Sequence, residues 1–384
     1  MIAVLLRAFP YALVTLFLLF LYSINREKKK LSGHDSKYLL LVGYFILLIF
    51  FGLRGFVMTD FVNYYPYFDS IDGIDSIPEI IMSKGWEPGF ILYTYLCKSI
   101  FPNYFAWNFI SCLIDLSILY VVLKKYSCNH FFSLIVFFVV GGIPLEMNVL
   151  RNAKAIFIFL IAIKYIEERR LFPFIAMILL AMTFHVSAVL YIPFYFFIHK
   201  KMPKWTLFVV FVFGCIILFG HISILSNIIN QIPIDLIGDN RAGYLVAQYL
   251  GETNTYGLSL GSIERVITYI TLSYIYIRII PNEDSDIIFY NLYFLLFIVF
   301  FYFYESHVIV QRIQYLLIPC FWIVYPSLFK NLRQIGLGRM RYIFIGFLFI
   351  KVFLYGSLPE DRYENLLFGI DSYEQRSSII DFME

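Results

Sequence analysis

Charged side chains are scarce in this sequence: only 15% of its 384 residues are Asp, Glu, Lys or Arg, whereas 60% are hydrophobic. Such a composition excludes a soluble globular protein. The formal charge of +3 is also too small to indicate a nucleic-acid partner. We find no repeat, low-complexity tract or interdomain linker, so we expect a single membrane domain over residues 1–384 with the lipid bilayer as its surroundings.

The motifs of several common chemistries are also missing. The sequence has no GxxxxGK phosphate loop, no HExxH and no Cys/His cluster, and its five cysteines lie singly in apolar segments. Nucleotide-driven transport and zinc hydrolysis therefore lack support, and we expect no metal site and no other cofactor. We interpret the lone cysteines as small core residues.

Long apolar runs account for most of the chain, and a hydrocarbon core about 30 Å thick needs about 20 apolar residues for each helical span. We identify about twelve runs, some of them half-length or broken, at residues 2–23, 38–54, 104–123, 130–144, 149–167, 171–184, 186–198, 204–220, 262–280, 287–304, 307–329 and 340–356. They must be helical, because lipid offers no partner to backbone polar groups. The predicted fold is an all-α, polytopic integral membrane protein with about 12 transmembrane helices.

The distribution of charge predicts the orientation. With both termini outside, the cytoplasmic side holds about 18 basic and about 7 acidic residues, and the outside about 12 basic and about 19 acidic ones. The long outer segments are then 55–86, 221–261 and the tail 357–384. Residues 171–198 must form two short helices hinged at His185, because one long helix would reverse the charge balance of the later segments. For the same reason, residues 87–101 are predicted to be an outer-leaflet or re-entrant helix.

Ionisable residues at membrane depth are costly and often mark function. The basic ones at the predicted outer face are Arg54, Arg151, Lys154, Arg265 and Arg312. Arg151 and Lys154 lie one turn apart and could bind one anion together. Arg265 is expected in the first turn of its helix, behind Ser262 as the N-cap. Several guanidinium groups on one side suit a phosphate-bearing ligand, most simply a diphosphate.

Each of these residues also has a structural alternative. The arginines could pair with acids such as Asp60, Glu87 or Glu264, and His185 could be a packed histidine. For Asp115, in the middle of an apolar run, we favour a buried polar contact over catalysis. Tyr64 and Tyr65 could stack on sugar rings, as could Tyr315, one turn from Arg312.

Several short motifs carry a family resemblance. They are Arg54-Gly55 followed by Asp60 and Tyr64, then Trp86-Glu87-Pro88-Gly89-Phe90, then Arg151-Asn152 opening an apolar helix, then Thr183-Phe184-His185-Val186-Ser187-Ala188, with a weaker echo in Arg362-Tyr363-Glu364-Asn365. In order and spacing the sequence resembles the EpsG/Wzy-type bacterial polysaccharide polymerases.

The resemblance implies a GT-C-like glycosyltransferase in the bacterial cytoplasmic membrane with its active site facing outside. It would join oligosaccharide repeat units carried on undecaprenyl diphosphate, as donor and acceptor, into O-antigen, capsule or exopolysaccharide. A chain-length regulator and a flippase are the further partners that it implies.

The chemistry of such a reaction assigns roles to the candidate residues. Arg151, Arg265 and Arg312 would hold the departing diphosphate, assisted by Arg54 and Lys154, without a metal ion. For the general base we favour His185, because histidine ordinarily has a pKa of about 6.5, with Asp60 and Glu87 as alternatives. Direct displacement would invert the anomeric centre. An O-antigen ligase, a lipid-linked oligosaccharide flippase and a membrane acyltransferase are the competing functions.

Overall fold

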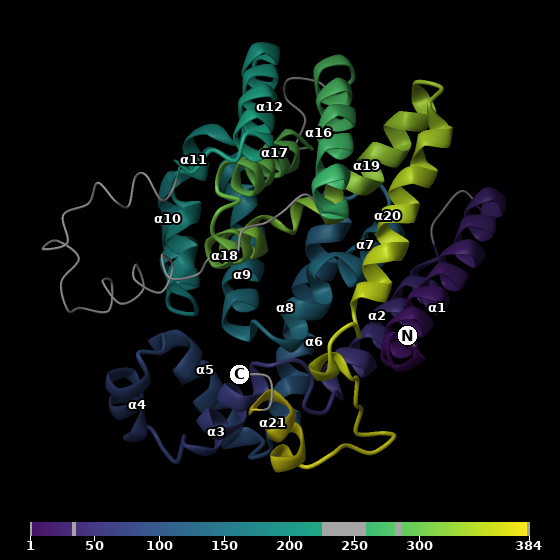
Figure 1. Ribbon diagram of the computed structural model, residues 1–384. Coiled ribbons are helices and arrows are strands. Elements are labelled where there is room, and N and C mark those ends of the chain that lie inside the picture. The colour runs from purple at the N-terminus through teal and green to yellow at the C-terminus, as the bar shows by residue number, and fades with distance from the viewer. Residues whose placement is uncertain (1, 33–35, 225–258, 281–285, 382–384) are drawn as a thin grey trace, which may run out of the picture. The chain divides into compact units, whose positions relative to one another are not determined.

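The computed structural model describes residues 2–32, 36–224, 259–280 and 286–381 (Figure 1). This part of the chain is helical and contains isolated β-bridges but no β-strand, which confirms the all-α prediction. It divides into two compact units, Met1–Tyr195 with Arg339–Glu384, and Phe196–Gly338, and each is described by itself. Of the predicted outer segment 221–261, residues 225–258 lie outside the described residues.

The first unit combines segments from both ends of the sequence. Its helices are α1 (Ile2–Ser32), α2 (Lys37–Gly52), α3 (Phe61–Asp69), α4 (Ser76–Lys84), α5 (Pro88–Ile100), α6 (Tyr104–Tyr126), α7 (His130–Phe137), η1 (Phe138–Gly142), α8 (Ile143–Met147), α9 (Leu150–Glu167), α10 (Leu171–Met182), η2 (Val186–Tyr191), η3 (Gly338–Met340, at the boundary), α20 (Arg341–Leu354), η4 (Pro359–Asp361) and α21 (Tyr373–Asp381). Helix α2 packs against α6, α10 against α9, and α1 against α20 (Figure 1). Local sequence sets several helix starts: Asn103 caps α6, and Pro88 occupies the first position of α5.

The second unit is built around α17 (Asp286–Tyr302). This helix packs against α12 (Lys204–Phe219), α16 (Leu260–Arg278), α18 (His307–Leu317) and α19 (Cys320–Gln334), while the short α11 (Phe194–Phe197) straddles the boundary between the units. The run 307–329, predicted as continuous, is bent by 59° between α18 and α19. Pro319 lies at the bend, where its ring nitrogen cannot donate a helical hydrogen bond.

Two other apolar runs are broken as well. The run 130–144 changes from α7 through the π-helical η1 to α8, with Gly141 in a left-handed conformation at φ +89°. The hinge predicted at His185 is confirmed, because α10 ends at Met182 and His185 is extended. Beyond the hinge the chain forms the 3₁₀ helix η2 and then α11, rather than one half-length α-helix; Pro193, between them, lacks a backbone donor.

Among the described residues, the helices Ala3–Leu31, Tyr104–Tyr126 and His130–Met147 are long and apolar enough to cross a membrane, and the bent pair α18–α19 could form a fourth span. Shorter apolar helices of 10–17 residues include α2, α10, α12 and α17. The chain is thus compatible with a membrane protein, and the count of about twelve spans stays a prediction.

The cysteines follow the prediction in part. Cys97, Cys112 and Cys320 are buried and free, and Cys215 is half-buried. Cys128 is exposed, contrary to the prediction, because it lies in the turn between α6 and α7.

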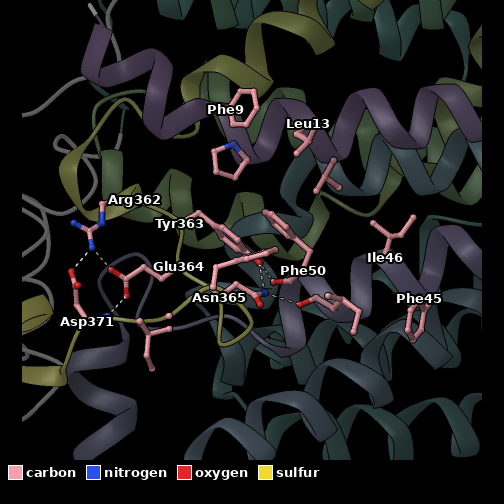
Figure 2. Close-up of a pocket in the computed structure, with 16 residues that line it drawn as sticks. Phe9, Leu13, Phe45, Ile46, Phe50, Arg362, Tyr363, Glu364, Asn365 and Asp371 are labelled. Carbon is pink, nitrogen blue, oxygen red and sulfur yellow. Dashed lines mark hydrogen bonds and ion pairs between the residues drawn. The ribbon is translucent and has the colours of Figure 1, made fainter.

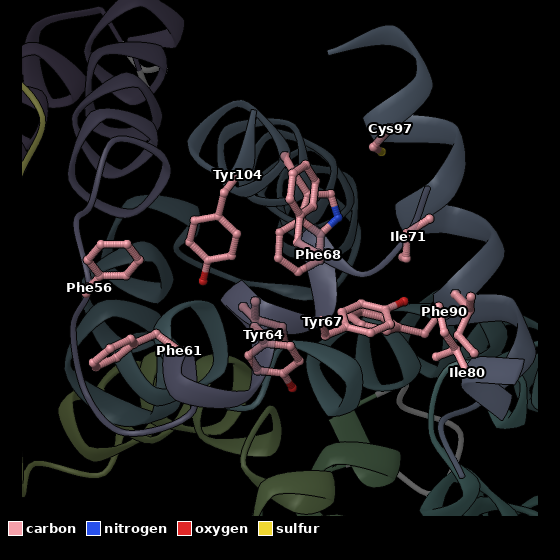
Figure 3. Close-up of a cluster of buried hydrophobic side chains, with 13 residues drawn as sticks. Phe56, Phe61, Tyr64, Tyr67, Phe68, Ile71, Ile80, Phe90, Cys97 and Tyr104 are labelled. Carbon is pink, nitrogen blue, oxygen red and sulfur yellow. The ribbon is translucent and has the colours of Figure 1, made fainter. Parts of the chain in front are cut away.

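The predicted outer segment 55–86 packs with α5 and the start of α6 around a buried aromatic cluster (Figure 3). Tyr64, Tyr67, Phe68, Phe90 and Trp107 are each at most 3% exposed. Rings in this cluster contact one another edge to face, tilted or stacked; Tyr64 and Trp86 meet edge to face with centroids 5.5 Å apart, and Tyr67 stacks on Phe90. This segment therefore has a core of its own, which fixes the residues that come after α2.

The C-terminal tail is bonded to the same segment. Gly55 N–H donates to the Glu364 carbonyl at 2.9 Å, and Met58 N–H donates to the Glu360 carbonyl at 3.0 Å. Arg376, 1% exposed, donates from Nε to the Phe56 carbonyl at 2.8 Å. Since a buried guanidinium needs several acceptors, these carbonyls explain how the tail is held.

Candidate active site

Glu87 and Arg151 form an ion pair between the starts of α5 and α9. Arg151 Nη1 lies 2.9 Å from Glu87 Oε2, and the two side chains are 26% and 13% exposed. The guanidinium carbon also lies 4.6 Å from the centroid of the Trp86 ring, a cation–π contact. The structure thus shows the acidic partner considered for the outer arginines, and it fixes the direction of the Arg151 side chain.

The turn between α10 and η2 contacts the same pair. Val186 N–H donates to Glu87 Oε1 at 3.2 Å, and Phe90 N–H donates to the Thr183 carbonyl at 3.1 Å. Both carboxylate oxygens of Glu87 therefore accept hydrogen bonds, one from Arg151 and one from the turn. Two motifs that lie almost 100 residues apart in the sequence meet here.

This contact requires a glycine at position 89. A Cβ atom there would lie 2.1 Å from Thr183 Oγ1 and 2.8 Å from the Thr183 carbonyl oxygen. Gly89→Ala is therefore expected to separate α5 from the turn and to lower the stability by about 2 kcal/mol or more. Thermal unfolding of the purified protein measures this effect. Gly73→Ala is the matched control, because a Cβ at Gly73 meets nothing within 4 Å, and an equal loss in both variants would contradict the explanation.

His185 is linked through Ser187 to the residue beside Arg151. Its Nδ1 lies 2.6 Å from Ser187 Oγ and 3.2 Å from Ser187 N, and Ser187 Oγ donates to Asn152 Oδ1 at 3.4 Å. The side chain also caps η2. The imidazole is consequently held beside the first turn of α9.

Asp60 and Tyr64 both form hydrogen bonds with residues near the start of α9. Asn148 Oδ1 accepts from Asp60 N–H at 2.8 Å, and the Tyr64 hydroxyl accepts from Arg151 N–H at 3.4 Å. Burial raises the pKa of the Tyr64 hydroxyl well above its ordinary value, so it stays neutral. The structure therefore brings together Asp60, Tyr64, Glu87, Arg151 and His185, three of them candidates for the base.

The predicted sugar-stacking role of Tyr64 does not agree with its environment. The side chain is 3% exposed and packs against Trp86, Phe90 and Trp107, so its ring faces protein. Tyr65 stacks on Tyr373 of the tail, with centroids 4.9 Å apart. This predicted outer segment was considered for contact with sugars, but its own aromatic cluster buries Tyr64.

Lys154 and Arg54, two other predicted ligands of the diphosphate, form their bonds with residues of α2 and α6. Lys154, 5% exposed, is paired with Asp115 of α6 and donates to the Ser111 carbonyl at 2.9 Å. This pairing confirms the buried polar contact predicted for Asp115, and it corrects the prediction that Lys154 and Arg151 grip one anion. Arg54, 3% exposed, donates to the Phe51 carbonyl at 2.9 Å and to Asn108 Oδ1 at 3.1 Å, so it too serves packing between α2 and α6.

Lys154→Ala is expected to destabilise the protein by about 3–5 kcal/mol, because it strands the Asp115 carboxylate in an apolar interior. The double variant Lys154→Met with Asp115→Leu should regain most of that loss, since neither charge of this pair is then buried without the other. Unfolding of the two variants in detergent by heat measures the difference. A stable Lys154→Ala protein that lacks only activity would instead favour the anion-binding role.

Arg265, Arg312 and Tyr315 belong to the second unit. Arg265 lies 3.2 Å from the Phe300 ring centroid. It is in the second turn of α16 rather than the first, because Ser259 is the N-cap and forms a capping box with Ser262. Arg312 is exposed on α18, and Tyr315 is half-buried one turn further. Their roles at a diphosphate or sugar stay predictions.

Four residues of the site were missed as individual candidates: Trp86, Asn148, Asn152 and Ser187. Trp86, Asn152 and Ser187 lie inside the motifs, which was the available signal, whereas Asn148 lies outside all of them. Among the described residues, no group of three His, Cys, Asp or Glu side chains could hold a metal ion.

Comparison with known proteins confirms the family resemblance. No curated protein and no solved structure matches the chain. Residues 37–367 match the EpsG family, a range that runs from α2 to the tail and includes every motif of the site. This match covers well over half of the sequence, and the chain therefore belongs to the EpsG family.

Proposed function

We propose that this protein is a glycosyltransferase that joins oligosaccharide repeat units, carried on undecaprenyl diphosphate, into a surface polysaccharide at the outer face of the bacterial cytoplasmic membrane. Membership of the EpsG family supports a role in polysaccharide polymerisation, and the apolar helices support a membrane location. The observation that carries the proposal is the contact of Arg151, Glu87 and the His185 turn within one group of residues.

Arg151 is the proposed cation for the departing diphosphate. A lipid diphosphate is already an activated leaving group, so the protein must chiefly stabilise the negative charge that develops on it. Glu87 and Trp86 fix the guanidinium, as residues that position a catalytic group should. In addition, Arg151 Nε is buried and has no hydrogen-bond partner among the described residues, a donor that a bound anion could satisfy.

His185 is the proposed base. The acceptor hydroxyl oxygen would form a bond to the anomeric carbon while the bond from that carbon to the diphosphate oxygen breaks. The diphosphate leaves with the electron pair, the acceptor proton passes to His185, and the anomeric configuration inverts. His185 Nδ1 accepts from Ser187 N–H at 3.2 Å and lies 2.6 Å from the Ser187 hydroxyl, and these contacts fix the orientation of the imidazole. Glu87 is less suited to this role, because both of its oxygens already accept hydrogen bonds.

Donor and acceptor each carry a diphosphate, so the reaction needs cations for two such groups. Arg265 and Arg312 are the proposed ligands of the second one, and Tyr65 and Tyr315 remain candidates for contact with sugar rings.

The direct test is a reaction of the purified protein with a synthetic lipid-linked repeat unit, followed by electrophoresis of the glycan. A ladder of products longer than one unit is expected, without nucleotide and without another enzyme. A single transfer to a different lipid acceptor would indicate a ligase, and no transfer by a folded protein that moves the lipid across vesicles would indicate a flippase.

The proposed sidedness predicts which positions a membrane-impermeant thiol reagent reaches in intact cells. In a background without the five native cysteines, single cysteines at 84, 151 and 185 should be labelled, whereas those at 125, 169 and 201 should be labelled only after lysis. Labelling of 201 but not of 185 from outside would reverse the orientation and contradict an outer active site.

A further inference from the structure

An apolar groove in the first unit lies beside the tail, outside the candidate active site. Its volume is about 870 Å³, and α1 and α2 form its walls with side chains that include Phe9, Leu13, Phe45 and Ile46 (Figure 2). Tail residues 362–365 and 368–371 line one end. Binding sites for small molecules have volumes of about 300–1,000 Å³ and are mostly apolar with a few polar groups, as here.

The polar groups of the groove all lie at the tail end. Arg362 is paired with Glu364 at 2.6 Å and with Asp371 (Figure 2). Behind them, the buried Arg376 lies 3.8 Å from Glu364. Two guanidinium groups thus face two carboxylates, and this end of the groove has no net charge. Arg362 and Asp371 remain 48% and 38% exposed, so a ligand could reach one charge of each sign.

The direction in which the apolar walls of the groove extend agrees with a bound lipid. On α1, Leu13 follows Phe9 by about one turn, toward the middle of the helix. On α2, Phe45 precedes Phe50 by more than one turn, also toward the middle, so the apolar walls extend away from the polar end. In the orientation predicted from the sequence, this direction leads from the outer surface into the hydrocarbon core.

We propose that the groove binds one zwitterionic phospholipid. Its phosphate would contact Arg362, its ammonium group would contact Asp371, and its chains would cover the walls on α1 and α2. The charges favour a zwitterion over an anionic lipid or a lipid diphosphate, because an added net negative charge would face Glu364 and Asp371 without a spare cation. Such a headgroup matches both exposed charges at once.

Occupancy of the groove would also affect the segment after α2. Tail residues at this end of the groove also bond to this segment. The Glu364 carbonyl accepts from Gly55 N–H, and the N–H of Leu366, which follows Asn365 in the chain, donates to the Leu53 carbonyl at 2.9 Å. A bound lipid would therefore stabilise the tail against residues 53–55 and raise the melting temperature of the protein.

Native mass spectrometry of the full chain in detergent tests the proposal with defined lipids. Phosphatidylethanolamine should bind roughly tenfold more tightly than phosphatidylglycerol with the same acyl chains, the difference that one charge-assisted contact at a half-exposed site can give. Asp371→Asn should abolish this preference. Leu13→Trp should fill the groove and remove the bound lipid, whereas Leu16→Trp is the matched control, because Leu16 is also exposed on α1 but does not line the groove.

Two results would overturn the proposal. They are equal binding of the two phospholipids to the wild-type protein, and identical lipid retention by Leu13→Trp and Leu16→Trp. The first is measured on the wild-type protein, so it decides the matter even if a variant fails to fold. Neither depends on the proposed polymerase activity, because both compare phospholipids or groove variants rather than the lipid-linked substrate.

Discussion

Arg151→Ala is expected to reduce polymer synthesis roughly 100- to 1,000-fold while the protein remains in the membrane. The reason is the loss of a donor that the proposed mechanism directs at charge developing on the leaving diphosphate, from a side chain that is only 26% exposed. Arg151→Lys should recover only part of the activity, since an ammonium group cannot present two parallel donors or stack on Trp86 in the same way. Chain length and amount, compared at equal protein level, measure the effect.

Two controls separate catalysis from folding. Arg170→Ala removes an arginine that also pairs with a glutamate and contacts an aromatic ring, but at an exposed position, so wild-type polymer is expected. The double variant Arg151→Ala with Glu87→Ala removes both members of the ion pair and leaves no carboxylate without a partner. If the double variant regained activity, Arg151 would serve only to neutralise Glu87. Wild-type polymer in Arg151→Ala would end the assignment altogether.

The sequence was sufficient to predict an all-helical chain and to single out the motifs that meet at the candidate site. Apolar runs have to be helical in lipid, and this rule needs no knowledge of tertiary contacts. The hinge at His185 was predicted from charge balance alone, and the structure confirms it. The residues of the site came from short motifs: Glu87 contacts Arg151 directly, and it contacts the residue next to His185.

Side-chain partners could not be predicted in the same way, because they depend on which helices pack together. Lys154 and Arg151 lie on one face of α9, but Asp115 of α6 takes Lys154 into the interior. Tyr64 lies in a predicted outer segment and was considered for stacking on sugar rings, yet the aromatic cluster buries it. The start of α16 was misplaced by a turn, since Ser259 and Ser262 are both plausible caps by type and only the backbone decides between them.

The pairing of the C-terminal tail with the segment after α2 could not be predicted from the sequence either. Residues 360–376 are separated from residues 53–58 by about 300 positions, and no pattern in either segment predicts that the two are hydrogen-bonded to each other. Arg376 was not a candidate of any kind, although it is 1% exposed and donates to three backbone carbonyls. Buried arginines of this kind can be recognised only when the carbonyl groups that they satisfy are known.

His185→Ala is expected to lower turnover by roughly 10²- to 10⁴-fold, the usual contribution of a positioned base, with little change in the binding of the lipid-linked substrate. Single-turnover rates and the affinity for the lipid-linked substrate, measured for the wild-type protein and the variant, test this expectation. His130→Ala is the matched control, because this histidine of α7 bonds to Tyr44 at 2.8 Å and has no proposed catalytic role.

Two further measurements distinguish the base from its competitors at the same site. Ser187→Ala removes the hydroxyl 2.6 Å from Nδ1 and should lower activity less than His185→Ala does, since it disturbs only the orientation and tautomer of the ring.

Activity should persist in EDTA, because arginine rather than a metal ion is proposed to neutralise the diphosphate. If EDTA stopped the reaction and Mg²⁺ restored it, Asp60 and Glu87 would become candidate metal ligands. If His185→Ala only lowered the melting temperature, His185 would be a packed histidine that caps η2, and Asp60, held by Asn148 beside the same helix start, would be the base to test next.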